Sequence, residues 1–199
     1  MARQQSKIKE LVYIGIYTAI YFLVVCISTG VLKLTVPIFN SIMIPALNAL
    51  LAGVIYLTVL DRVPRFGALT TIGIVMGIFF LITGHFPIAF VPELIFSLLA
   101  DWLQHGTRGG KTKIYLSYTI FSFGLTGPIL PLWFMKQAYI NELVSRGKDQ
   151  AYINHVFAAV TNVSFVISMG SIVVCSILGM WIAQKIYDKH LAGLRGTRS

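Results

Sequence analysis

Long apolar segments recur along this chain, and they limit its fold more than any other feature. Windows of about 20 mostly apolar residues, the length that crosses a hydrocarbon core of roughly 30 Å, can be placed six times. They fall at residues 11–29, 41–60, 66–84, 86–105, 114–135 and 156–184. Because 56% of the residues are hydrophobic and only 12% are charged, an ordinary soluble domain is excluded. The sequence therefore predicts an all-α membrane protein, a six-transmembrane-helix bundle that forms one membrane domain over residues 1–199.

The basic residues predict the orientation of this bundle. Although the formal net charge is +9, the Lys and Arg residues lie between the apolar segments rather than in a patch typical of nucleic-acid binding. Twelve of the 16 fall on one side: Arg3, Lys7, Lys9, Arg62, Arg65, Arg108, Lys111, Lys113, Lys185, Lys189, Arg195 and Arg198. Since cytoplasmic loops carry an excess of Lys and Arg, both termini are expected in the cytoplasm of a multi-pass membrane protein.

Glu93 lies in the middle of the fourth apolar segment, which contains no Lys or Arg. An ionisable group at membrane depth is costly unless it is paired, hydrated or protonated, so it marks a candidate functional site. Ser97, Asp101 and His105 follow Glu93 at intervals of four residues, and this spacing predicts a polar face directed into the bundle. We interpret Asp101 and His105, near the cytoplasmic end, as structural.

Polar or helix-breaking residues are expected at one depth in four of the segments. Counting 1.5 Å per residue places Asn48, Glu93, Asn162 and the pair Gly127-Pro128 roughly 9–12 Å below the outer boundary. Prolines near this level free backbone carbonyls, which survive in a membrane only against protein or a water-filled cavity. We therefore predict a ligand pocket that opens outward and includes these residues. In the alternative, the two asparagines only hydrogen-bond between helices and the prolines only kink them.

Residues near the outer loops complete the predicted ligand site. This rim comprises His85, Phe86, Trp133 and His155. Aromatic residues at this level also form the ordinary interfacial belt, which is an alternative interpretation of Trp133. The partly helical spacing of apolar residues in 136–155 predicts a short helix over the outer surface.

Small residues four apart predict close contacts between helices. They occur as Gly15/Ala19, Ala49/Gly53, Gly73/Gly77 and Gly179/Ala183. Cys26 and Cys175 are expected to pack as free thiols. Since no Gly-x-x-x-x-Gly-Lys-Ser/Thr, His-Glu-x-x-His or Gly-x-Ser-x-Gly motif occurs, the chain is not expected to hydrolyse ATP or to act as a common hydrolase.

Over almost its whole length, the chain resembles the substrate-binding S components of energy-coupling factor (ECF) transporters. The length, the six apolar segments, the basic start and the pair Gly15/Ala19 carry this resemblance. That pair is similar to the Ala-x-x-x-Ala motif with which S components dock on the energising membrane subunit, although Gly replaces the first Ala. Within the superfamily, the Pro92-Glu93 context is similar to the MptD or Trep_Strep family.

The resemblance implies capture of a vitamin or other micronutrient from outside, followed by delivery through an energising transmembrane subunit and two ATPases. Buried carboxylate and aromatic residues favour a flat ligand with a cationic or hydrogen-bond-donating group. Haem is a further candidate, with His85 and His155 as axial ligands. No resident cofactor, metal site or nucleic-acid partner is predicted. The alternatives are an intramembrane enzyme and a structural membrane partner without a ligand.

Overall fold

The computed structural model describes residues 2–36, 40–106 and 110–190, and these contain helices and no strand. Predicted cytoplasmic residues Arg108, Arg195 and Arg198 lie outside the described part. The elements are α1 (Ala2–Thr35), α2 (Asn40–Leu51), α3 (Gly53–Arg62), α4 (Ala68–Ile82), η1 (Pro87–Ala89), α5 (Phe90–Gly106), α6 (Lys111–Ser122), η2 (Phe123–Thr126), α7 (Pro131–Phe134), α8 (Lys136–Ser145), α9 (Gln150–Ala158) and α10 (Asn162–His190).

Three stretches of helix in the described residues are long and apolar enough to cross a membrane. They are Lys7–Thr35, Pro87–His105 and Asn162–Lys189. A fourth candidate is the pair α2 and α3, which bends by 51° at its break. The predicted all-helical membrane fold is thus confirmed, whereas the count of six spans and the cytoplasmic termini stay predictions.

The third and fifth predicted spans contain shorter helices than their predicted ranges. Helix α4 has 15 residues and begins after Gly67, whose positive φ of 99° suits glycine. The segment 114–135 is divided into α6, η2 and α7, which agrees with the interruption expected at Pro128 and Pro131. Two glycines and two prolines lie at these breaks: Gly124, Gly127, Pro128 and Pro131. The prolines interrupt the helix because proline cannot donate the backbone hydrogen bond that a continuous helix needs.

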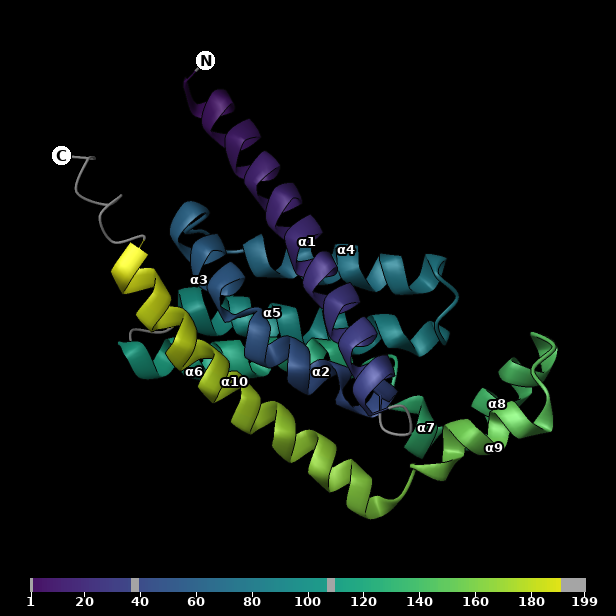
Figure 1. Cartoon of the computed structure of the whole chain (residues 1–199). Coiled ribbons are helices and arrows are strands. Elements are labelled where there is room, and N and C mark those ends of the chain that lie inside the picture. The colour runs from purple at the N-terminus through teal and green to yellow at the C-terminus, as the bar shows by residue number, and fades with distance from the viewer. Residues whose placement is uncertain (1, 37–39, 107–109, 191–199) are drawn as a thin grey trace.

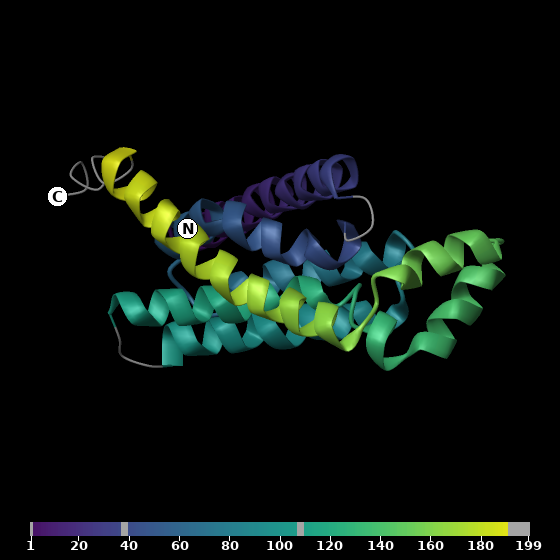
Figure 2. The same ribbon diagram turned by 60° about the horizontal axis from the view of Figure 1, so that its bottom comes forward.

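The helices form two crossing groups (Figure 1). Helices α4, α5 and α6 lie side by side, α4 against α5 and α5 against α6. Helix α10 crosses α2, α3 and α6, and α1 packs on α2, α3 and α4. The turned view in Figure 2 places α8 and α9 at one end of the molecule, beyond the helices of the bundle. The ends of α3, α5 and α10 lie at the opposite end, where the sequence places the cytoplasm.

Three of the four small-residue pairs form contacts inside the bundle. The pair Ala49/Gly53 packs against the pair Gly179/Ala183. The approach is close, since a methyl group added at Gly53 would lie only 2.7 Å from the Gly179 carbonyl oxygen. The pair Gly73/Gly77 instead faces α5, where added methyl groups would collide with Ser97 and Phe90. Small residues therefore let these helices approach closely, as predicted. The fourth pair, on α1, has no such partner and is described below.

Candidate functional site: an aromatic cavity between α1, α2 and the α8–α9 hairpin

A cavity of about 790 Å³ lies at the end of the bundle that carries α8 and α9. Its wall comes from the second half of α1, the start of α2, the end of α4, the segment from η2 to α7, and one face of α8 and α9. This volume lies within the range of small-molecule sites, which are usually concave and largely apolar. The cavity is therefore the candidate ligand site, on the side that the sequence predicts to face outward.

Aromatic side chains make up much of the cavity wall. Phe22, Phe79 and Phe80 lie on the helices of the bundle, and Tyr139 and Tyr152 lie on the α8–α9 hairpin. The rings of Phe22 and Phe79 pack edge to face, with centroids 4.4 Å apart. Since aromatic faces stack readily, this wall suits a flat apolar ligand.

Two of the predicted rim residues, His85 and His155, line the same cavity. They come from different segments of the chain, His85 from the turn after α4 and His155 from α9. The Nδ1 atom of His85 is 3.0 Å from the Thr83 hydroxyl oxygen. Burial lowers the pKa of His85, and the nearby Arg146 cation lowers it further. His85 therefore favours the neutral imidazole. The pair predicted as axial ligands for haem thus lies around one cavity.

The other two predicted rim residues, Phe86 and Trp133, lie outside the cavity lining. The Phe86 ring lies 6.0 Å from that of Tyr139, measured between centroids, and so holds a residue that does line the cavity. Burial also raises the pKa of Tyr139, which keeps its hydroxyl protonated at neutral pH. Trp133 donates its indole N–H to the Thr161 carbonyl oxygen at 2.9 Å and packs on Phe165. Neither Phe86 nor Trp133 is part of the lining.

Glu93 and Asn48 are buried polar residues that lie outside the cavity wall. Their side chains are 2% and 1% exposed, and Glu93 Oε1 and Asn48 Oδ1 have no hydrogen-bond partner among the described residues. Tyr21 is close enough to interact with both. Tyr21, Asn48 and Gly124 belong to α1, α2 and η2, the same elements that line the cavity. The predicted polar layer therefore exists around Glu93, but Glu93 and Asn48 do not line the cavity.

The remaining two residues of the predicted layer lie elsewhere. Gly127 contacts the backbone of Ala89, so it is the point at which the broken fifth segment crosses η1. Asn162 was placed about six residues inside a helix, and that depth was wrong: α10 begins at Asn162, which is exposed. The reason lies just before it, where Thr161 and Ser164 cap the helix by exchanging backbone-to-side-chain hydrogen bonds of 2.9 and 3.0 Å.

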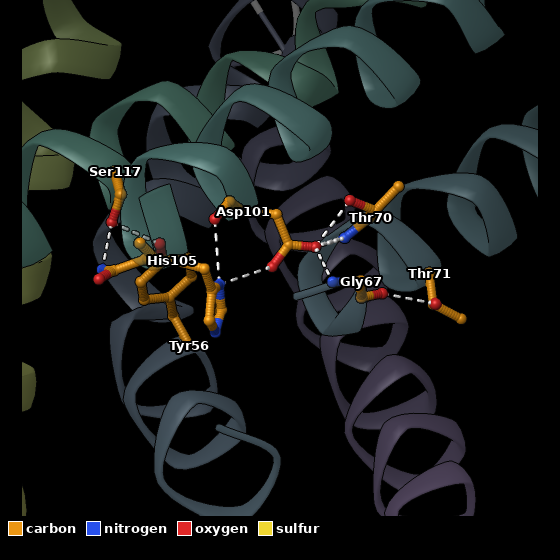
Figure 3. Close-up of polar contacts among 8 residues, drawn as sticks. Tyr56, Gly67, Thr70, Thr71, Asp101, His105 and Ser117 are labelled. Carbon is orange, nitrogen blue, oxygen red and sulfur yellow. Dashed lines mark hydrogen bonds and ion pairs between the residues drawn. The ribbon is translucent and has the colours of Figure 1, made fainter. Parts of the chain in front are cut away.

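The polar face of α5 ends in a structural interaction, as predicted for Asp101. Figure 3 shows its carboxylate directed at the start of α4. Asp101 Oδ2 accepts hydrogen bonds from the Gly67 and Thr70 backbone amides at 3.0 and 2.7 Å, and from the Thr70 hydroxyl at 2.6 Å. His105 lies on the other side, 3.5 Å from Asp101 Oδ1. Asp101 is thus the N-terminal cap of α4, supplied by the neighbouring helix.

A second groove runs along α1 and α4 and adjoins the aromatic cavity, with which it shares Phe22 and Phe79. Its volume is about 420 Å³, and Gly15 and Ala19 lie in it together with Ile14, Thr18 and Val75. Gly15 and Ala19 are exposed, and a methyl group added at Gly15 would meet nothing within 4 Å. This small-residue pair therefore presents an open apolar surface instead of an internal helix contact.

Several lining residues were not predicted as ligand contacts from the sequence. They include Phe22, Cys26, Thr29, Phe79 and Tyr152. The sequence draws attention to polar groups inside apolar segments, whereas Phe22 and Phe79 look like any other apolar residue of a membrane helix. The spacing of Phe22, Cys26, Thr29 and Lys33 by three or four residues is a signal that one face of the first segment serves a common purpose.

The sequence pattern of one protein family matches residues 8–192, which is almost the whole chain. The family is described as "Hypothetical bacterial integral membrane protein (Trep_Strep)". The chain belongs to the Trep_Strep family. This confirms the family resemblance and agrees with the long apolar helices of a multi-pass membrane protein. No curated protein and no solved structure matches this Trep_Strep chain.

Proposed function

We propose that this Trep_Strep protein is the substrate-capture S component of an ECF-type importer in the bacterial plasma membrane. It crosses the membrane six times, with α2–α3 and the segment from α6 to α7 as broken spans and both termini in the cytoplasm. It takes up a vitamin or other micronutrient from outside. Delivery then requires an energising transmembrane subunit and two ATPase subunits, because the chain has no P-loop of its own.

Two adjoining surfaces carry this proposal, a cavity and a groove that meet at Phe22 and Phe79. The aromatic cavity of about 790 Å³ lies at the end predicted to face outward, while the groove around Gly15 and Ala19 runs along α1 and α4. A capture subunit needs one concave site for its ligand and another face for the subunit that moves it. The other three small-residue pairs are used in contacts between helices of the bundle, whereas the pair Gly15/Ala19 is exposed. This difference supports docking as the role of Gly15/Ala19.

The placement of the acidic residues favours capture over intramembrane catalysis. Glu93 is buried outside the cavity wall, and Asp101 binds the start of α4 at the other end of α5. Eight residues of helix, roughly 12 Å, separate them, so they cannot act on one reacting group. Under this proposal Glu93 and Asn48 support the helices that form the cavity floor.

Two measurements on the full chain test this function. Native mass spectrometry of protein extracted gently from its membrane should show one small molecule bound per chain, and absorbance of the same sample identifies haem if that is the molecule. Affinity purification from the native membrane should also recover two ATPase subunits and a transmembrane partner. Protein that carries no small molecule and recovers no ATPase would fit a structural membrane partner and refute the proposal.

A further inference from the structure

The one permanent charge in the wall of the aromatic cavity, among the described residues, is positive. Lys33 lines the cavity together with His85 and His155, and none of the seven acidic residues of the chain does. The two acids of the α8–α9 hairpin are occupied: Glu142 Oε1 binds Arg146 at 2.6 and 2.9 Å, and Asp149 caps α9 by accepting the Tyr152 amide at 2.8 Å. No carboxylate is therefore directed at a ligand in the cavity.

The other acidic residues lie away from the cavity. Glu10 pairs with Arg65 at 2.9 Å near the start of α4, where Asp101 is also engaged. Asp61 and Asp188 belong to the last turns of α3 and α10, at the end predicted to be cytoplasmic. Glu93 is buried and does not line the cavity. A cationic ligand would thus find the Lys33 ammonium in the wall and no carboxylate in contact.

Lys33 is the permanent positive charge of this wall. It lies in the last turn of α1, where the carbonyl end of the helix favours a cation, and it is exposed rather than used in a contact within the bundle. His85, held neutral by burial and by Arg146, instead offers a hydrogen bond. The Tyr152 hydroxyl on the same wall adds a further donor, whereas the Thr29 hydroxyl already donates to the Val25 carbonyl oxygen at 2.8 Å.

We infer that the cavity binds a flat aromatic molecule that carries an anionic group, a carboxylate or a phosphate. Its rings lie against Phe22 and Phe79, and its anion lies at Lys33. This inference rests on the proposed capture function and names the ligand class for that site. It replaces the cationic or hydrogen-bond-donating ligand expected from Glu93 alone, because the structure places Glu93 outside the cavity wall. Basic side chains that bind an anion in a partly apolar site give strong, charge-assisted hydrogen bonds.

Dyes of similar flat shape and opposite charge test the inference directly. Fluorescein carries a carboxylate, flavin mononucleotide carries a phosphate, and rhodamine 123 has a xanthene ring system like that of fluorescein but is cationic, with its carboxyl group blocked as a methyl ester. Binding is measured by fluorescence polarisation with the full chain in nanodiscs of zwitterionic phosphatidylcholine, and empty nanodiscs give the background. At least one anionic dye should bind about tenfold more tightly than rhodamine 123, and the better of the two distinguishes carboxylate from phosphate.

Matched variants then locate the anion. Lys33→Met should remove most of the preference for the anionic dye, about tenfold in Kd, whereas Lys136→Met should not. Lys136 lies at the same end of the molecule as the cavity but is not part of the cavity wall. Its ammonium nitrogen lies over the Phe157 ring, 5.2 Å from the ring centroid. Rhodamine 123 binding as tightly as both anionic dyes would overturn the inference, and so would equal effects of the two variants.

The proposed function and the ligand class fail in different ways. A cationic or non-aromatic molecule found on the protein by native mass spectrometry would refute the ligand class while leaving capture intact. A chain that carries no small molecule and recovers no ATPases would instead refute capture itself, and with it the inference.

Discussion

Asp101 binds Thr70 through both the backbone amide and the hydroxyl of that residue, at 2.7 and 2.6 Å from one carboxylate oxygen. Thr70 belongs to the first turn of α4, whose amides have no partner within the helix. A residue on α5 thus caps a helix that it packs against. The short α4 depends on this interaction for the order of its first turn.

Asp101→Ala should destabilise the folded protein by about 1–3 kcal/mol, because it leaves the half-buried Gly67 and Thr70 donors without this acceptor. Asp101→Asn should cost about half as much, since an amide oxygen can still accept. Thermal unfolding in detergent, followed by tryptophan fluorescence, gives the comparison. Asp188→Ala, at an exposed position on α10, is the control. Equal melting temperatures for the three variants would show that the cap contributes nothing.

Gly179 allows α10 to approach α2 closely. A methyl group added there would contact the Ala49 carbonyl oxygen and lie 2.7 Å from that of Leu50. Gly179→Ala should therefore force the helices apart and destabilise the protein by about 1–3 kcal/mol. Gly170→Ala lies on the same helix but meets nothing within 4 Å, so it should be neutral or slightly stabilising. A loss of stability in Gly170→Ala that equals the loss in Gly179→Ala would argue against the contact.

Glu93 tests whether the buried cluster holds the fold or binds the ligand. A buried carboxylate with an unpartnered Oε1 and no cationic partner among the described residues is costly, and glutamine has nearly the same shape without the charge. Glu93→Gln should therefore keep or raise the melting temperature. It should leave dye affinity within about twofold, because Glu93 does not line the cavity.

The limited space around the Glu93 side chain is a separate requirement of the fold. A methyl group added at Gly124 would lie 2.7 Å from Glu93 Oε2, which shows how little space remains. Gly124→Ala should therefore destabilise the protein by about 1–3 kcal/mol even though Glu93→Gln does not. A tenfold loss of dye affinity in Glu93→Gln with an unchanged melting temperature would instead assign Glu93 to the ligand.

The sequence predicted individual helices better than it predicted their ends. The apolar length of α1 and α10 and the breaks at Pro128 and Pro131 could be read directly. The start of α10 could not, because the hydroxyl pair Thr161 and Ser164 is a weaker signal than a run of apolar residues. Counting depth from the wrong start then placed Asn162 in the polar layer. Capping chemistry, rather than hydropathy, decides such boundaries.

The candidate site shows a related limit. His85 and His155 could be proposed because polar residues near outer loops are conspicuous, and both line the cavity. Phe22 and Phe79 could not, since their role depends on how α1 crosses α4, a tertiary contact that no local pattern specifies. Glu93 was conspicuous for its cost at membrane depth, yet it does not line the cavity.

Cys26 offers a chemical test of the cavity from the outer side. Its thiol lies in the cavity wall and is exposed. In a Cys175→Ala background, a membrane-impermeant sulfonated maleimide added to intact cells should label Cys26 and then abolish dye binding. A saturating anionic dye should slow this labelling at least threefold. Labelling only after the cells are permeabilised would contradict the predicted orientation, and unchanged dye binding after full labelling would contradict the placement of the ligand.

Ala19 separates docking from capture. It lies with Gly15 in the groove on α1 and α4 and does not line the aromatic cavity, and both residues are exposed. Ala19→Leu fills that groove, so it should reduce recovery of the energising subunit and ATPases at least fivefold while dye affinity stays unchanged. Ile20→Phe adds similar bulk at a neighbouring exposed position outside the groove and should preserve recovery. Full recovery with Ala19→Leu would place the docking surface on another face of the bundle.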